Sequence, residues 1–146
     1  MTKTNNSDFE QLFNAIMQFG KLMSRHEQED REDKNATMLQ HMALRFLKDQ
    51  PNGMVSDLAN FLKLSKSSTT QLTERLVEAN LVERFYDKKD RRIIRLAITE
   101  KGEKEFVVLK KRFMEKTEKI FSKIPAKDIK ELVRIFTNLI ETLKKE

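Results

Sequence analysis

A run of short hydroxyl side chains opens an amphipathic segment in the middle of the chain. Five of the six residues from Ser65 to Thr70 are Ser or Thr, which is a poor composition for a helix start. Such hydroxyls donate to phosphates and base edges, and the free N–H groups of a first helical turn favour anions. Gln71 has the amide that pairs with adenine, and Arg75 can reach phosphate or guanine. A solvated helix with an elaborate cap would show the same pattern. The DNA contacts expected on this helix are Ser65, Lys66, Ser67, Ser68, Thr70, Gln71 and Arg75.

A basic hairpin follows this helix. Residues Leu81–Tyr86 and Arg92–Ile98 have the composition of two strands, joined by a short charged loop. From residue 63 to 95 there are nine Lys or Arg against five Asp or Glu, so four of the chain's six net positive charges lie there. A cationic hairpin beside a reading helix can straddle a phosphate ridge and place an Arg in the minor groove. This localised charge favours DNA binding over the solvated helix. The expected contacts on the hairpin are Lys88, Lys89, Arg91 and Arg92.

Two closely spaced helices are predicted to position these residues. The first runs from Ser56, as N-cap, to about Leu64, and the second spans Lys66–Glu78 with Ser65 as its N-cap. This is a helix-turn-helix pattern. Asn80 is a plausible stop because Asn tolerates left-handed backbone geometry. The side chains expected to pack inward from the second helix are Leu72, Leu76 and the methyls of Thr69 and Thr73.

Longer helices are predicted on both sides. Apolar residues at offsets of three and four from Phe9 to Met23 indicate an amphipathic helix, and an exposed loop is expected to end near Lys34. A second helix should start at Thr37, with Gln40 completing a capping box. It should end before the breaker Pro51-Asn52-Gly53. Its expected inner face is Met38, Met42, Phe46 and Leu47.

The C-terminal third is also predicted to be helical. Thr99 should cap a long helix, and Pro125 is placed as the first residue of a final one. The terminal helices together carry more apolar surface than a small winged domain can cover. They either pack on their own domain or meet a second copy, and the width of the stripes favours a homodimer. The stripe of the final helix is Ile129, Leu132, Val133, Phe136, Leu139, Ile140 and Leu143.

Composition bounds the remaining possibilities. At 146 residues, the chain suits one domain, or a small domain with helical extensions. It has no cysteine, no apolar leader and no run long enough to cross a membrane, so a cytoplasmic location is expected. His26 lies near acidic residues and His41 on a predicted helix, but two histidines without cysteine make a thin metal site. We therefore expect no metal and no cofactor. No nucleophile–base pair stands out, so the chain is not expected to be an enzyme.

Four segments together resemble the signature of the MarR family of bacterial regulators. They are Ser65-Lys66-Ser67-Ser68, Leu81-Val82-Glu83-Arg84, Asp90-Arg91-Arg92 and Ile98-Thr99-Glu100-Lys101-Gly102. The family pattern is Asp-x-Arg, five residues, an aliphatic residue and then Thr-x-x-Gly. The similarity of organisation extends over nearly the whole chain.

The resemblance implies a triangular homodimer whose terminal helices form the dimerisation region. It also implies a palindromic operator in double-stranded DNA and, often, release of that DNA by a small anionic or phenolic effector. Asp90 and Arg92 match the wing pair, in which Asp90 would hold the tip while Arg92 or Arg91 reaches DNA. His41 would lie on a helix that borders the effector cleft; the effector-binding residues themselves are not identified.

This sequence departs from the family pattern at four positions. Thr69 and Thr73 replace more usual valines, and their hydroxyls then need partners. Gln71 stands where Arg is frequent, which shifts the expected preference from guanine toward adenine. Asn80 replaces a glycine.

The expected fold is mainly α with a small β-hairpin wing: a winged helix-turn-helix flanked by long dimerisation helices. Its parts are residues 1–34, an N-terminal helix; 35–99, the DNA-binding domain; and 100–146, the C-terminal helices. The helix-turn-helix covers about 54–79 and the wing about 82–98. The expected function is a DNA-binding repressor. A helical adaptor with non-specific nucleic-acid affinity is the alternative, but it leaves the hydroxyl run and the basic hairpin unexplained.

Overall fold

The structure is a computed structural model that describes residues 4–29 and 38–145, with side chains described for 4–23 and 38–145. The chain forms two compact units, residues 1–37 and 38–146. The expected exposed loop before Lys34, the cap at Thr37 and the side chain of His26 lie outside the described residues and side chains. Within the described part, no helix is long and apolar enough to cross a membrane.

The first unit consists of α1, Asn6–Glu29. It opens with a reciprocal cap, because the Asp8 amide donates to Asn5 Oδ1 (2.9 Å) and the Asn5 amide donates to Asp8 Oδ2 (3.1 Å). The helix predicted from the apolar period is therefore confirmed. Its apolar stripe is exposed in the single chain, with Phe9, Phe13 and Ile16 each more than half accessible.

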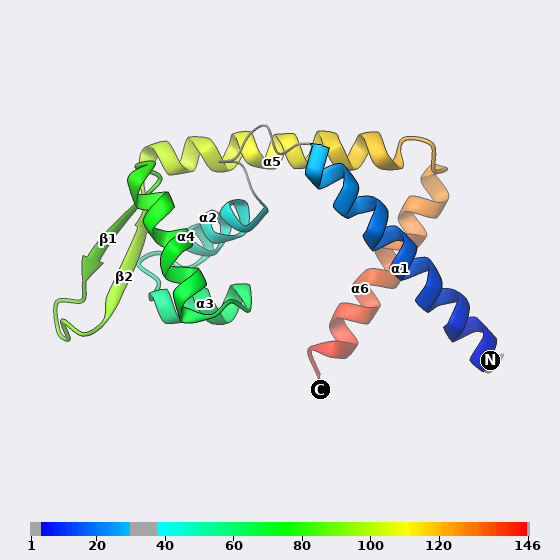
Figure 1. Ribbon diagram of the computed structural model, residues 1–146, viewed down its shortest axis with the longest axis horizontal. Coiled ribbons are helices and arrows are strands. Elements are labelled where there is room, and N and C mark those ends of the chain that lie inside the picture. Colours follow the sequence, from blue (N-terminus) through cyan, green and yellow to red (C-terminus); the bar gives the residue numbers. More distant parts are fainter. Residues whose placement is uncertain (1–3, 30–37, 146) are drawn as a thin grey trace. The chain divides into compact units, whose positions relative to one another are not determined.

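The second unit contains six elements after α2, which spans Met38–Asp49. They are α3 (Val55–Leu62), α4 (Lys66–Glu78), β1 (Val82–Tyr86), β2 (Ile94–Ile98), α5 (Glu100–Phe121) and α6 (Ala126–Leu143). Figure 1 shows α2, α3 and α4 gathered beside the first half of α5, with the hairpin projecting from the same end. The order confirms the expected fold class, a mainly helical chain with one small antiparallel hairpin.

The core of this unit lies where α2 packs against α5, α3 and β2. Leu44, Leu58, Leu76 and Leu96 are fully buried there. The predicted inner face of α2 is right for Phe46 and Leu47, but wrong for Met38, which is 47% exposed. The buried stripe is centred on Gln40, Leu44 and Leu47, and at 100° per residue Met38 falls on the other side of the helix.

The start of α3 differs from the prediction. The helix begins at Val55 with Met54 as its N-cap and no side-chain cap bond, so Ser56 is not the cap. The cause lies outside the local sequence. Met54 forms a β-bridge with Arg95, and the Leu96 amide donates to the Gly53 carbonyl (3.0 Å). The chain therefore leaves the sheet and turns directly into the helix, two residues before Ser56.

The end of α4 is closed by a Schellman motif. The Asn80 amide donates to the Val77 carbonyl (2.9 Å), and the Leu81 amide donates to the Leu76 carbonyl (2.9 Å). Asn80 itself has φ 58°, the left-handed conformation that the motif requires. The predicted stop at Asn80 is confirmed, and Asn is accepted in place of glycine because its side chain tolerates this conformation.

The start of α5 is joined to the end of α4. Thr99 is the N-cap as predicted, and its Oγ1 accepts from the Gly102 amide (3.0 Å) and donates to the Asn80 carbonyl (2.6 Å). The Thr99 amide donates to the Leu81 carbonyl (3.1 Å). A Cβ on Gly102 would stand 2.1 Å from that same oxygen. Only glycine at this position lets the two helices and β1 meet so closely.

The hairpin pairs β1 with β2 so that Val82 opposes Ile98 and Tyr86 opposes Ile94. The strands are those predicted, but they start at Val82 and Ile94, one and two residues later than expected. The Ile93 amide donates to the Asp90 carbonyl (3.0 Å), so the residues up to Ile93 belong to the turn.

The last two helices leave apolar surface uncovered. Phe106 and Leu109 of α5 are buried, whereas no residue of α6 is buried in the single chain. Pro125 is the N-cap of α6 and not its first residue, because its ψ of 142° is extended. Of the seven stripe residues predicted for this helix, six are exposed and Ile129 is half-buried.

The close approach at Gly102 gives the first prediction. Gly102→Ala should lower the free energy of unfolding by about 3 kcal/mol, because backbone atoms on both sides must separate to admit the methyl group. Urea unfolding followed by circular dichroism measures this. Lys104→Ala is the control: its ion pair with Glu100 is exposed, so the change should stay below about 0.5 kcal/mol. Equal stability of Gly102→Ala and the wild-type protein would contradict the packing described.

Candidate nucleic-acid interface

The first turn of α4 is organised around Ser65. Its Oγ accepts from the Ser68 amide (3.1 Å) and donates to the Ser68 hydroxyl (3.0 Å), with the Ser67 hydroxyl 3.2 Å away. The predicted cap is thereby confirmed. All three serines and Lys66 are exposed, so this polar turn faces solvent with its hydroxyls accessible.

The two faces of α4 differ in character. Thr69, Leu72, Thr73 and Leu76 are buried, as predicted from their spacing. The hydroxyls that replace valine methyls here are satisfied inside the helix: Thr69 Oγ1 donates to the Ser65 carbonyl (2.9 Å) and Thr73 Oγ1 to the Thr69 carbonyl (2.8 Å). These two departures from the family pattern are therefore accommodated without an unpaired group in the core.

The opposite face of α4 carries most of the predicted contact residues. Gln71 and Arg75 are exposed, and Thr70 is half-buried with its hydroxyl donating to the Lys66 carbonyl (2.9 Å). Sequence reasoning missed Glu74, which lines the same shallow depression as Ser67 and Gln71. A carboxylate there can accept from cytosine N4 and disfavours a phosphate at that point. The available signal was its position seven residues after Ser67 and three after Gln71, which places all three on one face of the helix.

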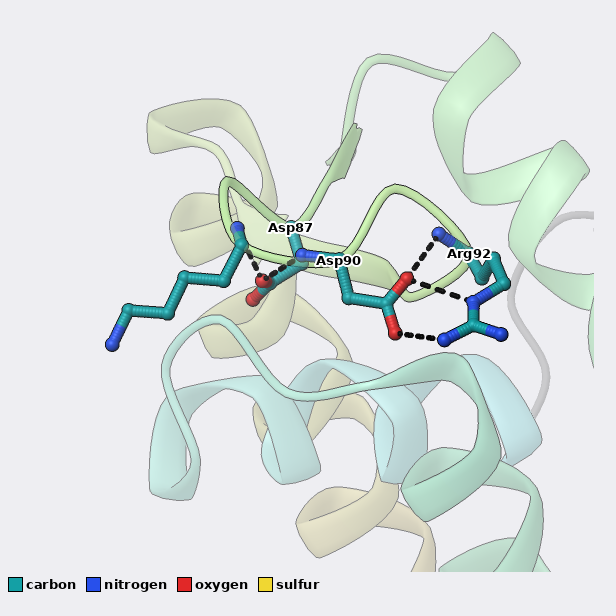
Figure 2. Close-up of polar contacts among 4 residues, drawn as sticks. Asp87, Asp90 and Arg92 are labelled. Atoms are coloured by element: carbon teal, nitrogen blue, oxygen red, sulfur yellow. Dashed lines mark hydrogen bonds and ion pairs between the residues drawn. The ribbon is translucent and has the colours of Figure 1, made fainter.

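Two aspartates shape the tip of the wing, as Figure 2 shows. Asp87 Oδ1 accepts from the Lys89 amide (2.8 Å) and the Asp90 amide (3.1 Å), which closes the first half of the turn. Asp90 accepts from the Arg92 amide (3.0 Å) and grips the Arg92 guanidinium through both carboxylate oxygens (3.1 Å each). The wing pair Asp90–Arg92 thus exists as a bidentate contact, and Asp90 contributes to the shape of the tip.

Arg95 is a wing residue that sequence reasoning left without a role. Its Nε donates to the Asp87 carboxylate, and its Nη1 donates to the Asn52 carbonyl (3.0 Å). It therefore joins the base of the tip to the turn that precedes α3. An aspartate followed by three polar residues is a typical Asx-turn signal, but the partner eight residues further on is set by strand register.

The hydrogen bonds at the tip act on both carboxylates. The Arg95 side chain, followed by the Lys89 and Asp90 amides, lowers the pKa of Asp87. The Arg92 side chain, followed by its own amide, lowers the pKa of Asp90. Both groups are therefore ionised at neutral pH, and their contribution to the folded tip is lost only as the pH falls through these lowered values.

The cations of the tip point into solvent. The side chain of Arg92 is 91% exposed although it is bound to Asp90. Lys88, Lys89 and Arg91 are exposed as well, and among the residues that the structure describes their side chains have no ion-pair partner. The five predicted wing residues therefore occupy one ordered turn whose charge is available to an anion.

His41 lies apart from this interface, between α2 and α5. Its ring stacks on Phe106 (centroids 4.8 Å apart, 5° between planes) and meets Phe113 edge-on at 5.5 Å. Its Nδ1 is buried without a hydrogen-bond partner in the structure. Burial is the main cause that lowers the pKa of His41, with the charges of Arg45 and Lys110 adding to it. In the part of the chain that the structure describes, no three His, Cys, Asp or Glu side chains are grouped so that they could hold a metal ion.

Two short helices joined by a tight turn, with the second exposed and followed by a cationic hairpin, define a winged helix-turn-helix protein of the DNA-binding class. A sequence model of the MarR family matches residues 36–94. An uncharacterised HTH-type transcriptional regulator of Bacillus subtilis, YpoP, is 36% identical over 110 residues, which cover 73% of this chain and 76% of YpoP. The chain belongs to the MarR family of transcriptional regulators, as its signature segments indicated, and is not an enzyme.

Further relatives agree with this assignment. The HTH-type transcriptional repressor MdtR of Bacillus subtilis is 33% identical over 78 residues, which cover 53% of this chain and 50% of MdtR. A MarR family protein from Bacillus stearothermophilus has the same fold, with a TM-score of 0.78 at 20% identity over 97% of this chain and 99% of that one. The YusO protein of Bacillus subtilis matches with a TM-score of 0.71 at 22% identity, covering 95% and 99% of the two chains.

The surroundings of His41 give the second prediction. Because its pKa is lower in the folded chain than the ordinary 6.5, the unfolded chain takes up the proton first. The stability due to neutral His41 is therefore present above about pH 6.5 and declines as the pH falls below it. Melting temperatures measured from pH 7.5 to 5 should fall more steeply for the wild-type protein than for His41→Phe, which keeps the ring stacking but does not titrate.

Both proteins contain the same other titrating groups. Subtracting one curve of melting temperature against pH from the other therefore leaves the contribution of His41. If the two proteins keep the same difference in melting temperature across this range, His41 titrates as an ordinary exposed histidine, and the buried environment described is wrong.

Proposed function

We propose that this regulator is a homodimeric repressor that binds a palindromic operator in double-stranded DNA and releases it on binding a small effector. The observation that carries the proposal is the exposed polar face of α4 beside the ordered cationic wing. In each protomer, α4 would enter the major groove and the wing would lie across the adjoining backbone. Two-fold symmetry would place the half-sites about 34–36 Å apart. Binding to such an operator would put the site of action in the cytoplasm.

The uncovered faces of the terminal helices support the dimer. On α6, Val133 and Phe136 are each about three-fifths exposed in the single chain. Contiguous apolar surface of this kind is covered by a partner in stable soluble proteins. A second copy supplies a matching face, because an isologous contact uses the same surface twice.

Repression and release are supported by relatives. MdtR is named a transcriptional repressor. Structures with this fold include the PcaV regulator of Streptomyces coelicolor with its natural ligand (TM-score 0.66, 20% identity, covering 86% and 91% of the two chains) and a MepR-like protein with pseudoligands (TM-score 0.63, 26% identity, covering 89% and 92%). For this chain, a small anionic or phenolic effector fits the charges of Arg45 and Lys110 near His41.

Selection of bound fragments from the host genome identifies the operator, and two variants then test the roles of wing and helix. Arg92→Ala should weaken binding on all operators alike and lower the slope of log K against log salt by about 1, because a phosphate contact is lost. Gln71→Ala should instead relax base preference at one position of each half-site, at a cost of about 1–3 kcal/mol on the preferred base.

Fluorescence anisotropy on the operator and on single-base variants distinguishes these outcomes. An unchanged salt slope for Arg92→Ala would remove the wing from the interface. A uniform loss across all sequences for Gln71→Ala would argue against direct base readout by this residue.

The dimer is tested separately by sedimentation velocity. The wild-type protein should sediment as a dimer at micromolar concentration, and Phe136→Glu should shift it toward the monomer because a charge then enters the shared apolar face. Lys130→Glu is the matched control, since this residue of α6 is already charged. A wild-type monomer would contradict the palindromic operator.

A further inference from the structure

A groove separates the helix-turn-helix from the wing, and it extends beyond the residues assigned to DNA so far. It has a volume of about 590 Å³ and is walled by α3 and the start of α4 on one side and by the hairpin on the other. We call it the wing groove. Its lining residues of interest are Ser56, Asn60, Lys66, Thr70, Arg84 and Arg92.

The charges of the wing groove are all of one sign. Lys66 of α4, Arg84 of β1 and Arg92 of the wing tip line it from three different elements. No carboxylate is among the residues that line it, whereas the depression over α4 includes Glu74. Arg92 is also bound to Asp90, whereas Lys66 and Arg84 have no ion-pair partner among the described residues. A groove lined by cations without carboxylates attracts an anionic ligand.

Arg84 lies on the inner face of the hairpin, although no polar contact among the described residues holds it there. In the hairpin register it opposes Leu96, so it shares the inner face of the sheet with buried Val82 and Leu96. It thus faces the helices, although its side chain is exposed. Among the described residues no hydrogen bond or ion pair to Arg84 is found, and its neighbour Glu83 lies on the other face of the sheet. The guanidinium of Arg84 is therefore unpaired, and it lines the groove.

Two neutral donors face these cations from α3. Because Met54 caps that helix, the hydroxyl of Ser56 is not used as a cap. One turn further on, Asn60 lines the groove as well. Hydroxyl and amide donors beside Lys and Arg are the set that contacts phosphate oxygens of a DNA backbone.

We propose that the wing groove holds a backbone phosphate of the operator, with Arg84 as a ligand of that phosphate and Ser56 and Asn60 as accessory donors. This inference rests on the proposed function. A strand that passes from the groove read by α4 to the groove entered by the wing must cross between these two elements. The phosphate in the wing groove would then fix the angle of α4 on the duplex without reading a base.

The first test compares Arg84→Gln with Lys104→Gln on the operator. Each variant loses one positive charge. Lys104 lies near the start of α5, pairs with the exposed Glu100 and is not among the residues that line the wing groove. Arg84→Gln should bind about tenfold more weakly and lower the salt slope by about 0.9, with base preference unchanged. Lys104→Gln should bind as the wild-type protein does. Arg84→Lys should restore part of the loss, and equal melting temperatures exclude misfolding.

The second test identifies the phosphate. Operators are prepared with one neutral methylphosphonate at a time along each half-site. At one position, the methylphosphonate should weaken binding of the wild-type protein about tenfold. The same substitution should leave the affinity of Arg84→Gln unchanged, because that variant has already lost the contact. Additive losses at every position would overturn the assignment of Arg84, as would wild-type affinity and slope for Arg84→Gln.

The outcomes distinguish the proposed function from the role of the wing groove. If the wild-type protein selects no operator, the proposed function is overturned together with this inference. If the wild-type protein selects an operator but Arg84→Gln is indistinguishable from it, only the wing groove is overturned. A free anion is tested with inorganic phosphate at constant ionic strength. Stabilisation of the wild-type protein but not of Arg84→Gln, with additive methylphosphonate effects, would assign the groove to a small anion and overturn the DNA phosphate.

Discussion

The contact between Gly102 and the Leu81 carbonyl is the constraint on which the placement of α4 and of the hairpin depends. At this junction the end of α4, the start of β1 and the start of α5 come together. They can do so because Gly102 has no side chain to keep the backbones apart. Thr99 completes it by linking the Asn80 carbonyl to the Gly102 amide. Helix α4 leaves the junction in one direction and the hairpin in another. Their relative placement is therefore set by backbone hydrogen bonds and not by flexible side chains, which gives the Thr-x-x-Gly part of the family signature a structural meaning.

At the far end of the hairpin, the backbone is held in place by two carboxylates. Asp87 and Asp90 gather the backbone amides of a cationic loop and hold Arg95 and Arg92. The Asp90–Arg92 pair is exposed and contributes little to overall stability, so its effect here is on geometry. Four cations are confined to one ordered turn, which lowers the entropy that a phosphate contact would otherwise cost. Arg95 adds a connection to the Asn52 carbonyl, so the tip is tied to the turn before α3 as well as to its own strand.

Local sequence determined the parts of the fold that depend on near neighbours. Ser65 and Thr99 were predictable as caps because each finds its amide three residues later, and Asn80 because a left-handed stop needs only its own backbone. The predictions that were wrong or missing concern residues whose partners lie far away in the sequence. Ser56 has the right chemistry for a cap, but a bridge between Met54 and Arg95, forty-one residues apart, starts α3 earlier. Arg95 and Arg84 counted only as charges in the sequence, since the register that gives each its face and partners exists only in the paired hairpin.

Native-state hydrogen exchange tests the central role of the junction most directly. The amides of Leu81 and Thr99 lie in connecting segments and the amide of Gly102 lies in the first turn of α5. Exchange is ordinarily fast in such places, yet each amide has a partner at the junction. If the junction holds α4 and the wing together, these three amides will exchange only with global unfolding. Their free energies of opening will then equal those of the buried amides of α4. Exchange by local opening, with α4 still protected, would show that the helix and the wing are positioned by something else.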